Sequence, residues 1–122
     1  FLVVKPEFGC PTGEAYRKYD ESPLEIHGGL ERFTAGLPGN YAPEMYSVFQ
    51  KLYSDRRIED ICARLTTLGA KGAMLTGSGS AVFGVFDNEA NAKRASGEFP
   101  GCFTAVSGCV REGVSITERE VL

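Results

Sequence analysis

The chain has 122 residues and a formal net charge of -3, and its apolar and charged fractions of 43% and 24% are ordinary for a globular protein. This length suits a single domain with one hydrophobic core, and the acidic balance gives no basic surface for nucleic acid. No apolar run approaches the length of a membrane span, and no signal-peptide pattern opens the chain. We therefore expect a cytoplasmic protein with neither nucleic acid nor membrane as a partner.

The four cysteines do not form a metal-binding pattern. They stand at positions 10, 62, 102 and 109, without a Cys-x-x-Cys pair, and His27 is the only histidine in the sequence. This spacing does not favour a zinc site, so we expect reduced thiols and no metal ligands in this chain.

The first third of the chain predicts one strand followed by helices. Residues 1–4 form an apolar run typical of a central strand, which Lys5-Pro6 ends. Because the chain starts at Phe1 inside this run and not at Met, we expect it to be one domain of a longer protein, with a processed chain as the alternative. Thr12 is a candidate cap for a helix over 13–19.

A second, weaker helix is predicted over 24–34. Ser22 can cap it and Pro23 suits its first turn, but Gly28 and Gly29 in its middle cost about 2 kcal/mol relative to alanine. A loop follows over residues 35–40.

Two amphipathic helices follow. Apolar residues at helical spacing predict a helix over 42–53 and a second one over 56–68, with Asp55 as its cap and Gly69 as its stop. We expect these apolar stripes to be core, and Arg56-Arg57 to be a solvated pair that opposes the helix dipole at a small cost.

The last third predicts strand, loop, strand, helix, strand. The strands are expected over 73–75, 81–86 and 102–110, with a bulge or close contact at Gly108, and the helix from 87–89 to 96. Val114 and Ile116 in the polar tail alternate as in an edge strand. The whole order predicts an α+β fold of the ferredoxin-like split β-α-β type, with an antiparallel sheet, helices on one face and an enlarged helical first crossover.

The loop Thr76-Gly77-Ser78-Gly79-Ser80 is the candidate functional feature. Glycines at 77 and 79 permit backbone angles closed to other residues, and successive N–H groups in such a loop can bind an anion, with Ser78 and Ser80 as further hydroxyl donors. The alternative interpretation is a plain hairpin connection that needs a positive φ at two positions.

Three segments together resemble a known enzyme family. They are Lys5-Pro-Glu-Phe-Gly-Cys-Pro-Thr-Gly-Glu-Ala-Tyr-Arg17, Met45-Tyr-Ser-Val-Phe-Gln50 and Gly69-Ala-Lys-Gly-Ala-Met-Leu-Thr-Gly-Ser-Gly-Ser-Ala-Val-Phe-Gly84. The third is similar to the third motif of the GHMP kinases, and all three resemble the C-terminal domain of the 4-diphosphocytidyl-2-C-methyl-D-erythritol kinase family. With these matches, the functional interpretation of the loop is favoured over the plain hairpin.

The resemblance implies half of a kinase. Such enzymes use ATP and Mg²⁺ to phosphorylate the 2-hydroxyl of a small-molecule substrate, the cytidyl-diphosphate erythritol of non-mevalonate isoprenoid biosynthesis in bacteria. Their main phosphate loop, catalytic Asp and Lys partner belong to an N-terminal domain that has no counterpart in residues 1–122. The resemblance therefore assigns no catalytic residue and no cofactor to this chain alone, and it places Thr76, Gly77, Ser78, Gly79 and Ser80 next to phosphate or substrate.

Some positions depart from the family pattern. Ser47 and Gln50 stand where the family usually has Asn and Glu, and Cys10-Pro11 replaces the more usual Val-Ser.

Two alternatives stay open: another GHMP kinase with a homoserine, mevalonate or sugar acceptor, and a free-standing ligand-binding or regulatory module. If the chain is instead the C-terminal domain of the erythritol kinase, we expect the isolated domain to be inactive. It exposes an apolar or glycine-rich face near residues 76 to 80 where its own N-terminal domain belongs, and this face promotes self-association.

Overall fold

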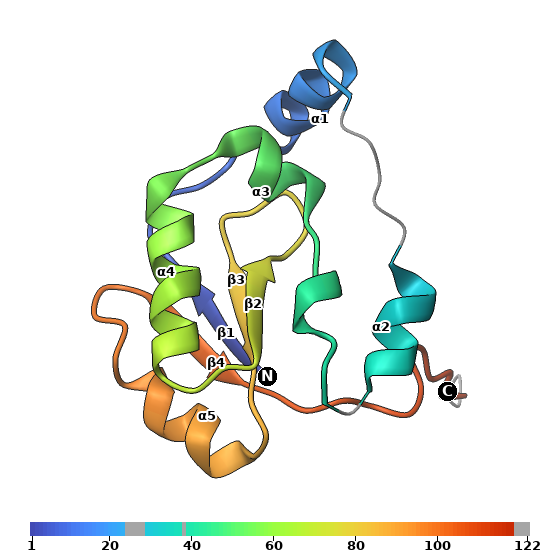
Figure 1. Ribbon diagram of the computed structural model, residues 1–122, viewed down its shortest axis with the longest axis vertical. Helices are drawn as coiled ribbons and strands as arrows, with labels where there is room; N and C mark the ends of the chain where they lie inside the picture. Colours follow the sequence, from blue (N-terminus) through green and yellow to red (C-terminus); the bar gives the residue numbers. More distant parts are fainter. Residues whose placement is uncertain (24–28, 38, 119–122) are drawn as a thin grey trace, which may run out of the picture.

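The computed structural model describes residues 1–23, 29–37 and 39–118. It contains four strands, five α-helices and one 3₁₀ helix within these ranges (Figure 1). In chain order they are β1 (Leu2–Lys5), α1 (Thr12–Glu21), α2 (Leu30–Gly36), η1 (Ala42–Glu44), α3 (Val48–Tyr53), α4 (Arg56–Thr67), β2 (Gly72–Leu75), β3 (Val82–Val85), α5 (Glu89–Ser96) and β4 (Phe103–Val106).

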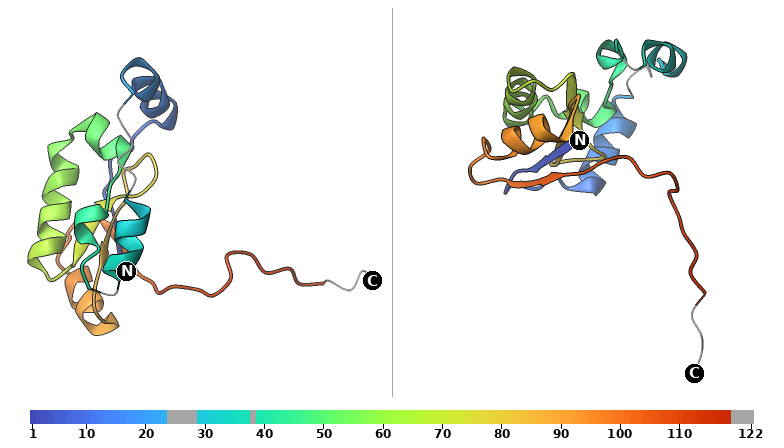
Figure 2. Two further views of the ribbon diagram at one scale, coloured as in Figure 1. Left: turned by 45° about the vertical axis from the view of Figure 1, so that its right-hand side comes forward. Right: turned by 90° about the horizontal axis from the view of Figure 1, so that it is seen from below.

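The four strands form one antiparallel sheet in the order β2-β3-β1-β4. Helices α4 and α5 pack on the same face of this sheet, α4 against β2 and β3, and α5 against β1 and β4 (Figure 2). Helices α1 to α4 all lie in the connection between β1 and β2. The predicted split β-α-β fold with an enlarged first crossover is therefore confirmed.

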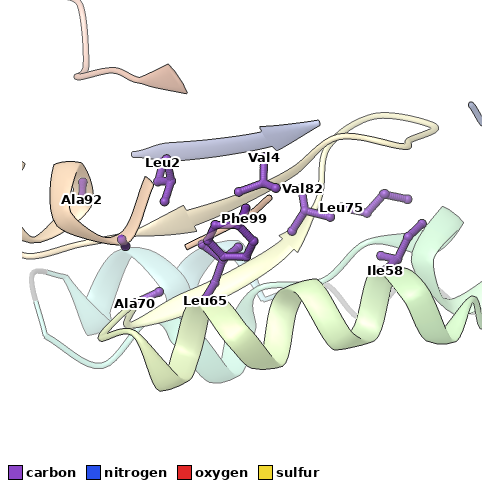
Figure 3. Close-up of a cluster of buried hydrophobic side chains, with 10 residues drawn as sticks. Leu2, Val4, Ile58, Leu65, Ala70, Leu75, Val82, Ala92 and Phe99 are labelled. Carbon is purple, nitrogen blue, oxygen red and sulfur yellow. The ribbon is translucent and has the colours of Figure 1, made fainter. Parts of the chain in front are cut away.

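The core lies between the sheet and its two covering helices (Figure 3). Alternation along β1 and β3 turns Leu2, Val4 and Val82 toward α4 and α5, and none of the three side chains is exposed. Helix α4 contributes Ile58 and Leu65, which lie seven residues apart on one face of the helix.

Helix α4 forms as its sequence predicts. The Asp55 side chain accepts a hydrogen bond from the N–H of Arg57, and Gly69 follows the helix with a φ of +107°. Arg57 pairs with the Asp55 carboxylate at 2.8 Å and stacks on the Phe8 ring at 3.7 Å, so its position at the helix start is compensated locally.

The continuous helix predicted over 42–53 is wrong. The chain forms η1, leaves helical geometry at residues 45–47 and starts again as α3. Ser47 is the reason for the restart, because its hydroxyl accepts a hydrogen bond from the N–H of Gln50 as a helix cap.

The predicted cap at Thr12 is wrong. Thr12 is the first residue of α1, and Pro11 stands at the cap position. Ser22 follows the last residue of α1, and it stays a predicted cap for the second helix. Residues 24–28 of the predicted second helix lie outside the described residues. Gly29 precedes α2 and is not inside a helix, so its expected cost to a helix interior does not arise.

The C-terminal strand is shorter than predicted. It ends at Val106, so Gly108 lies outside it and forms no bulge there. Beyond Ser107 the described part of the tail makes no strand and extends away from the domain, with Val110, Val114 and Ile116 at least 80% exposed (Figure 2). None of the described helices is long and apolar enough to cross a membrane.

Cys62 generates a prediction about stability and pH. Burial raises the pKa of its thiol to about 11 from an ordinary value of 9.0. Between these two pH values the unfolded chain has lost a proton that the folded chain retains, so the free energy of unfolding decreases as pH rises through this window. We expect urea unfolding at several pH values to show this decrease.

A matched pair of variants tests the assignment. Cys62→Ala makes the decrease with pH shallower, whereas Cys109→Ala at an exposed position leaves it unchanged. If the free energy of unfolding of Cys62→Ala decreases with pH as steeply as that of the unchanged chain, the pH dependence comes from other groups.

Candidate functional site

The glycine-rich loop connects β2 to β3 and is closed by its own backbone. The N–H of Thr76 donates to the carbonyl of Ala81 at 2.9 Å, and the N–H of Gly79 donates to the carbonyl of Thr76 at 3.1 Å. Gly77 and Gly79 have φ values of +57° and +90°, so both glycines are needed for the turn, as predicted.

This closure decides which loop donors are free. Gly79 uses its N–H inside the turn, whereas the N–H groups of Gly77 and Ser78 make no hydrogen bond within the described residues. These two adjacent donors remain for an anion.

The two serines differ in position. Ser78 is half-buried, and its hydroxyl lies 3.0 Å from the hydroxyl of Thr12 at the start of α1. One hydrogen joins the two oxygens, so this pair retains one hydroxyl hydrogen that can be donated to a ligand. Ser80 is 1% exposed and its hydroxyl donates to the carbonyl of Phe8. Ser80 therefore supports the loop from inside and does not present the hydroxyl donor that we expected.

Lys5 contacts the C-terminal end of the loop through Ser80. Its Nζ donates to the Ser80 hydroxyl at 2.8 Å and to the carbonyls of Pro6 and Phe8 at 2.8 and 3.2 Å. The pairing of Val4 with Val82 brings the end of β1 to the start of β3 and so places Lys5 there.

The residues between β1 and α1 pack against the loop. Gly79 leaves little room for a side chain, since an added Cβ would lie 3.0 Å from Leu75 Cδ1 and 3.1 Å from Cys10 Sγ. Burial, followed by the Asp55 charge, raises the pKa of the Cys10 thiol, so this cysteine is not activated as a nucleophile. The Tyr53 hydroxyl donates to the Pro11 carbonyl at 3.3 Å and holds the start of α1.

The sheet has an open hollow beside the loop, on the face opposite the core. It has a volume of about 240 Å³ and is lined by Phe1, Val3, Thr76, Phe83 and Ser107. Within the described residues, no three His, Cys, Asp or Glu side chains come together as metal ligands. The site therefore offers backbone donors, hydroxyls and one nearby cation, which suit a phosphate group.

Sequence reasoning found the loop and missed most of its surroundings. The sequence predicts Thr12 as a cap and predicts no role at the loop for Lys5, Phe8 or Cys10. The signal for Lys5 was its position at the end of the first strand, but only the pairing of β1 with β3 makes that position a neighbour of Ser80.

Comparison with known proteins identifies the class. The family description "GHMP kinases C terminal" matches residues 29–104, and the chain belongs to this family. The same fold occurs in a crystal structure of 4-(cytidine 5'-diphospho)-2C-methyl-D-erythritol kinase, with a TM-score of 0.68, 22% identity, and coverage of 84% of this chain and 41% of that chain.

Curated relatives share one printed name. The chain is 32% identical over 99 residues to a 4-diphosphocytidyl-2-C-methyl-D-erythritol kinase of Clostridium novyi, covering 76% of this chain and 35% of that protein. It is 31% identical over 125 residues to the enzyme of that name from Caldanaerobacter subterraneus, covering 94% of this chain and 43% of the relative. The chain thus spans less than half the length of these relatives.

Substitutions at the two loop glycines test the geometry. Alanine at Gly77 meets open space and costs about 1 kcal/mol from its positive φ alone, whereas alanine at Gly79 adds contacts with Leu75 and Cys10 and costs about 3 kcal/mol. Urea unfolding of Gly77→Ala and Gly79→Ala measures both. Equal losses in the two variants would contradict the packing of Cys10 and Leu75 against the loop.

Proposed function

We propose that this chain is the C-terminal part of an ATP-dependent kinase that phosphorylates the 2-hydroxyl of 4-diphosphocytidyl-2-C-methyl-D-erythritol in non-mevalonate isoprenoid biosynthesis. The observation that carries the proposal is the loop over 76–80, with two free N–H donors and a hydroxyl pair, in a chain whose curated relatives bear this name. A cytoplasmic, bacterial location accords with those relatives.

In this proposal the loop positions phosphate groups and does not carry out bond making. The N–H groups of Gly77 and Ser78 and the Thr12–Ser78 hydroxyl pair bind phosphate oxygens, and their fixed orientation stabilises charge on the transferring group. In this proposal ATP, Mg²⁺, a general base and the main phosphate loop belong to an N-terminal domain, as the resemblance to the kinase family implies.

The outer face of the sheet supports a partner domain. Strand register aligns Met74, Phe83, Val3 and Ala105 in one row across all four strands, on the side opposite α4 and α5. Phe103 on this face is 68% exposed, and Thr76 of the loop lines the same hollow as Val3 and Phe83. A domain that covers this row also reaches the loop, so we assign the face to the N-terminal domain.

The kinase assay needs the full-length protein that carries this chain. We expect it to phosphorylate the erythritol substrate in preference to homoserine, mevalonate or a free sugar, and we expect residues 1–122 alone to be inactive. Preference for another acceptor would overturn the substrate assignment. Activity of residues 1–122 alone would overturn the assignment of catalysis to a second domain. Ligand binding by the full-length protein without phosphoryl transfer to any acceptor would favour a regulatory module.

Two glycine variants test the loop within that assay. Gly77→Ala and Gly101→Ala both place alanine in open space at a positive φ, of +57° and +76°, but only Gly77 belongs to the loop. We expect Gly77→Ala to lower kcat/KM about tenfold, which is about 1.4 kcal/mol of transition-state stabilisation, and Gly101→Ala to leave it within about twofold. Equal kcat/KM values for the two variants would contradict the assignment of the loop to the substrate site.

The outer face predicts self-association of residues 1–122. At high concentration we expect sedimentation to show dimers or larger species, because this face carries the exposed Phe103 beside a row of half-buried apolar side chains. Phe103→Ser reduces the association, whereas Leu30→Ser, at a 77% exposed position on α2, does not. A chain that stays monomeric, or an equal response to both changes, would contradict this assignment of the face.

A further inference from the structure

The Lys5 ammonium has a complete set of neutral partners. An ammonium has three donors, and here they meet the Ser80 hydroxyl and the carbonyls of Pro6 and Phe8 at 2.8 to 3.2 Å. The Ser80 hydroxyl in turn donates to the Phe8 carbonyl, which closes a triangle between Lys5, Ser80 and Phe8. This triangle joins the segment after β1 to the end of the glycine-rich loop, 75 positions away in the chain.

No carboxylate of the described residues pairs with Lys5. The ion pairs of the described residues involve other lysines and arginines, and none includes Lys5, although its contacts are partly buried. A partly buried cation without a counter-charge is costly unless hydrogen bonds compensate it, and a nearby anion reduces that cost further. The bond to Ser80 places this charge at the end of the loop that also carries the N–H groups of Gly77 and Ser78.

We infer that Lys5 is a positioning residue for phosphate binding at this loop. Its ammonium holds Ser80 and Phe8 together, which fixes the end of the loop relative to Thr12 and Ser78, and its charge favours a phosphate or diphosphate anion at the loop. Lys5 acts through its bond to Ser80 and through its charge, and it does not itself contact the ligand. This inference rests on the proposed function, because it requires that the loop bind phosphate.

The test uses residues 1–122 and pyrophosphate as the probe, with the backbone N–H signals of Gly77 and Ser78 followed by NMR. We expect saturable shifts in the unchanged chain, and about tenfold weaker binding in Lys5→Met. Lys71→Met is the matched control, because Lys71 is an exposed lysine outside the loop whose Nζ lies 3.2 Å from the Asp87 carboxylate. We expect the affinity of Lys71→Met for pyrophosphate to stay within about twofold of that of the unchanged chain.

Two further variants separate geometry from charge. Ser80→Ala keeps the Lys5 ammonium and removes its hydrogen bond to the loop, so we expect pyrophosphate to bind more weakly. The double variant Lys5→Met with Ser80→Ala binds pyrophosphate no more weakly than Lys5→Met alone, because both substitutions remove the same contact. Lys5→Arg keeps the charge, so it binds more tightly than Lys5→Met and preserves the decrease of affinity with salt, which is shallower in Lys5→Met. Additive losses, or a salt dependence unchanged in Lys5→Met, would overturn the inference.

The unchanged chain provides a measurement that needs no folded variant. The Lys5 ammonium is hydrogen-bonded on all three donors, so its NMR signal exchanges with water more slowly than those of exposed lysines, and it shifts during the pyrophosphate titration together with Gly77. If the Gly77 signal shifts and the Lys5 signal does not, the role of Lys5 is refuted and phosphate binding by the loop is not. Absence of any response at Gly77 and Ser78 would refute the phosphate loop and the inference with it.

Discussion

The antiparallel pairing of β1 with β3 is the constraint on which the rest of this structure depends. It places Val4 opposite Val82 and so brings two segments almost 80 positions apart into contact. On one side of the sheet the pairing builds the core with α4 and α5. At its end it sets Lys5 beside Ser80, and the glycine-rich loop acquires its support there.

The loop divides its polar groups between holding its own shape and facing outward. The N–H groups of Thr76 and Gly79 and the hydroxyl of Ser80 bond within the protein. The N–H groups of Gly77 and Ser78 and the hydroxyl pair of Thr12 and Ser78 stay at the surface of the loop. Because the first set is satisfied internally, the second set keeps a fixed orientation before any ligand arrives, and such preorganisation is what makes donors effective toward a developing charge.

The two departures from the family pattern in the middle of the chain have structural roles. Ser47 caps α3, a role that asparagine fills equally well. The side-chain oxygen of Gln50 accepts a hydrogen bond at 2.8 Å from the N–H of Leu75 in β2, which is an edge strand of the sheet formed by the described residues. A glutamate oxygen can accept the same bond, so both exchanges preserve the support of the strand that leads into the loop.

The sequence by itself determined the elements whose signals are local. Apolar spacing predicted α4, Asp55 and Gly69 marked its ends, and the glycines at 77 and 79 predicted a turn with positive φ, because each of these depends on residues within one or two turns of the chain. The order of strands and helices was enough for the split β-α-β fold, and the motif around the loop for the kinase family.

Only the tertiary structure decided what surrounds the loop. Thr12 bonds to Ser78 and is not a cap, Ser80 faces inward and not toward a ligand, and Lys5 meets the loop from another strand. The break between η1 and α3 likewise comes from a capping bond of Ser47 that competes with a continuous helical pattern. These features depend on strand register and on partners far away in the sequence, and no local periodicity encodes them.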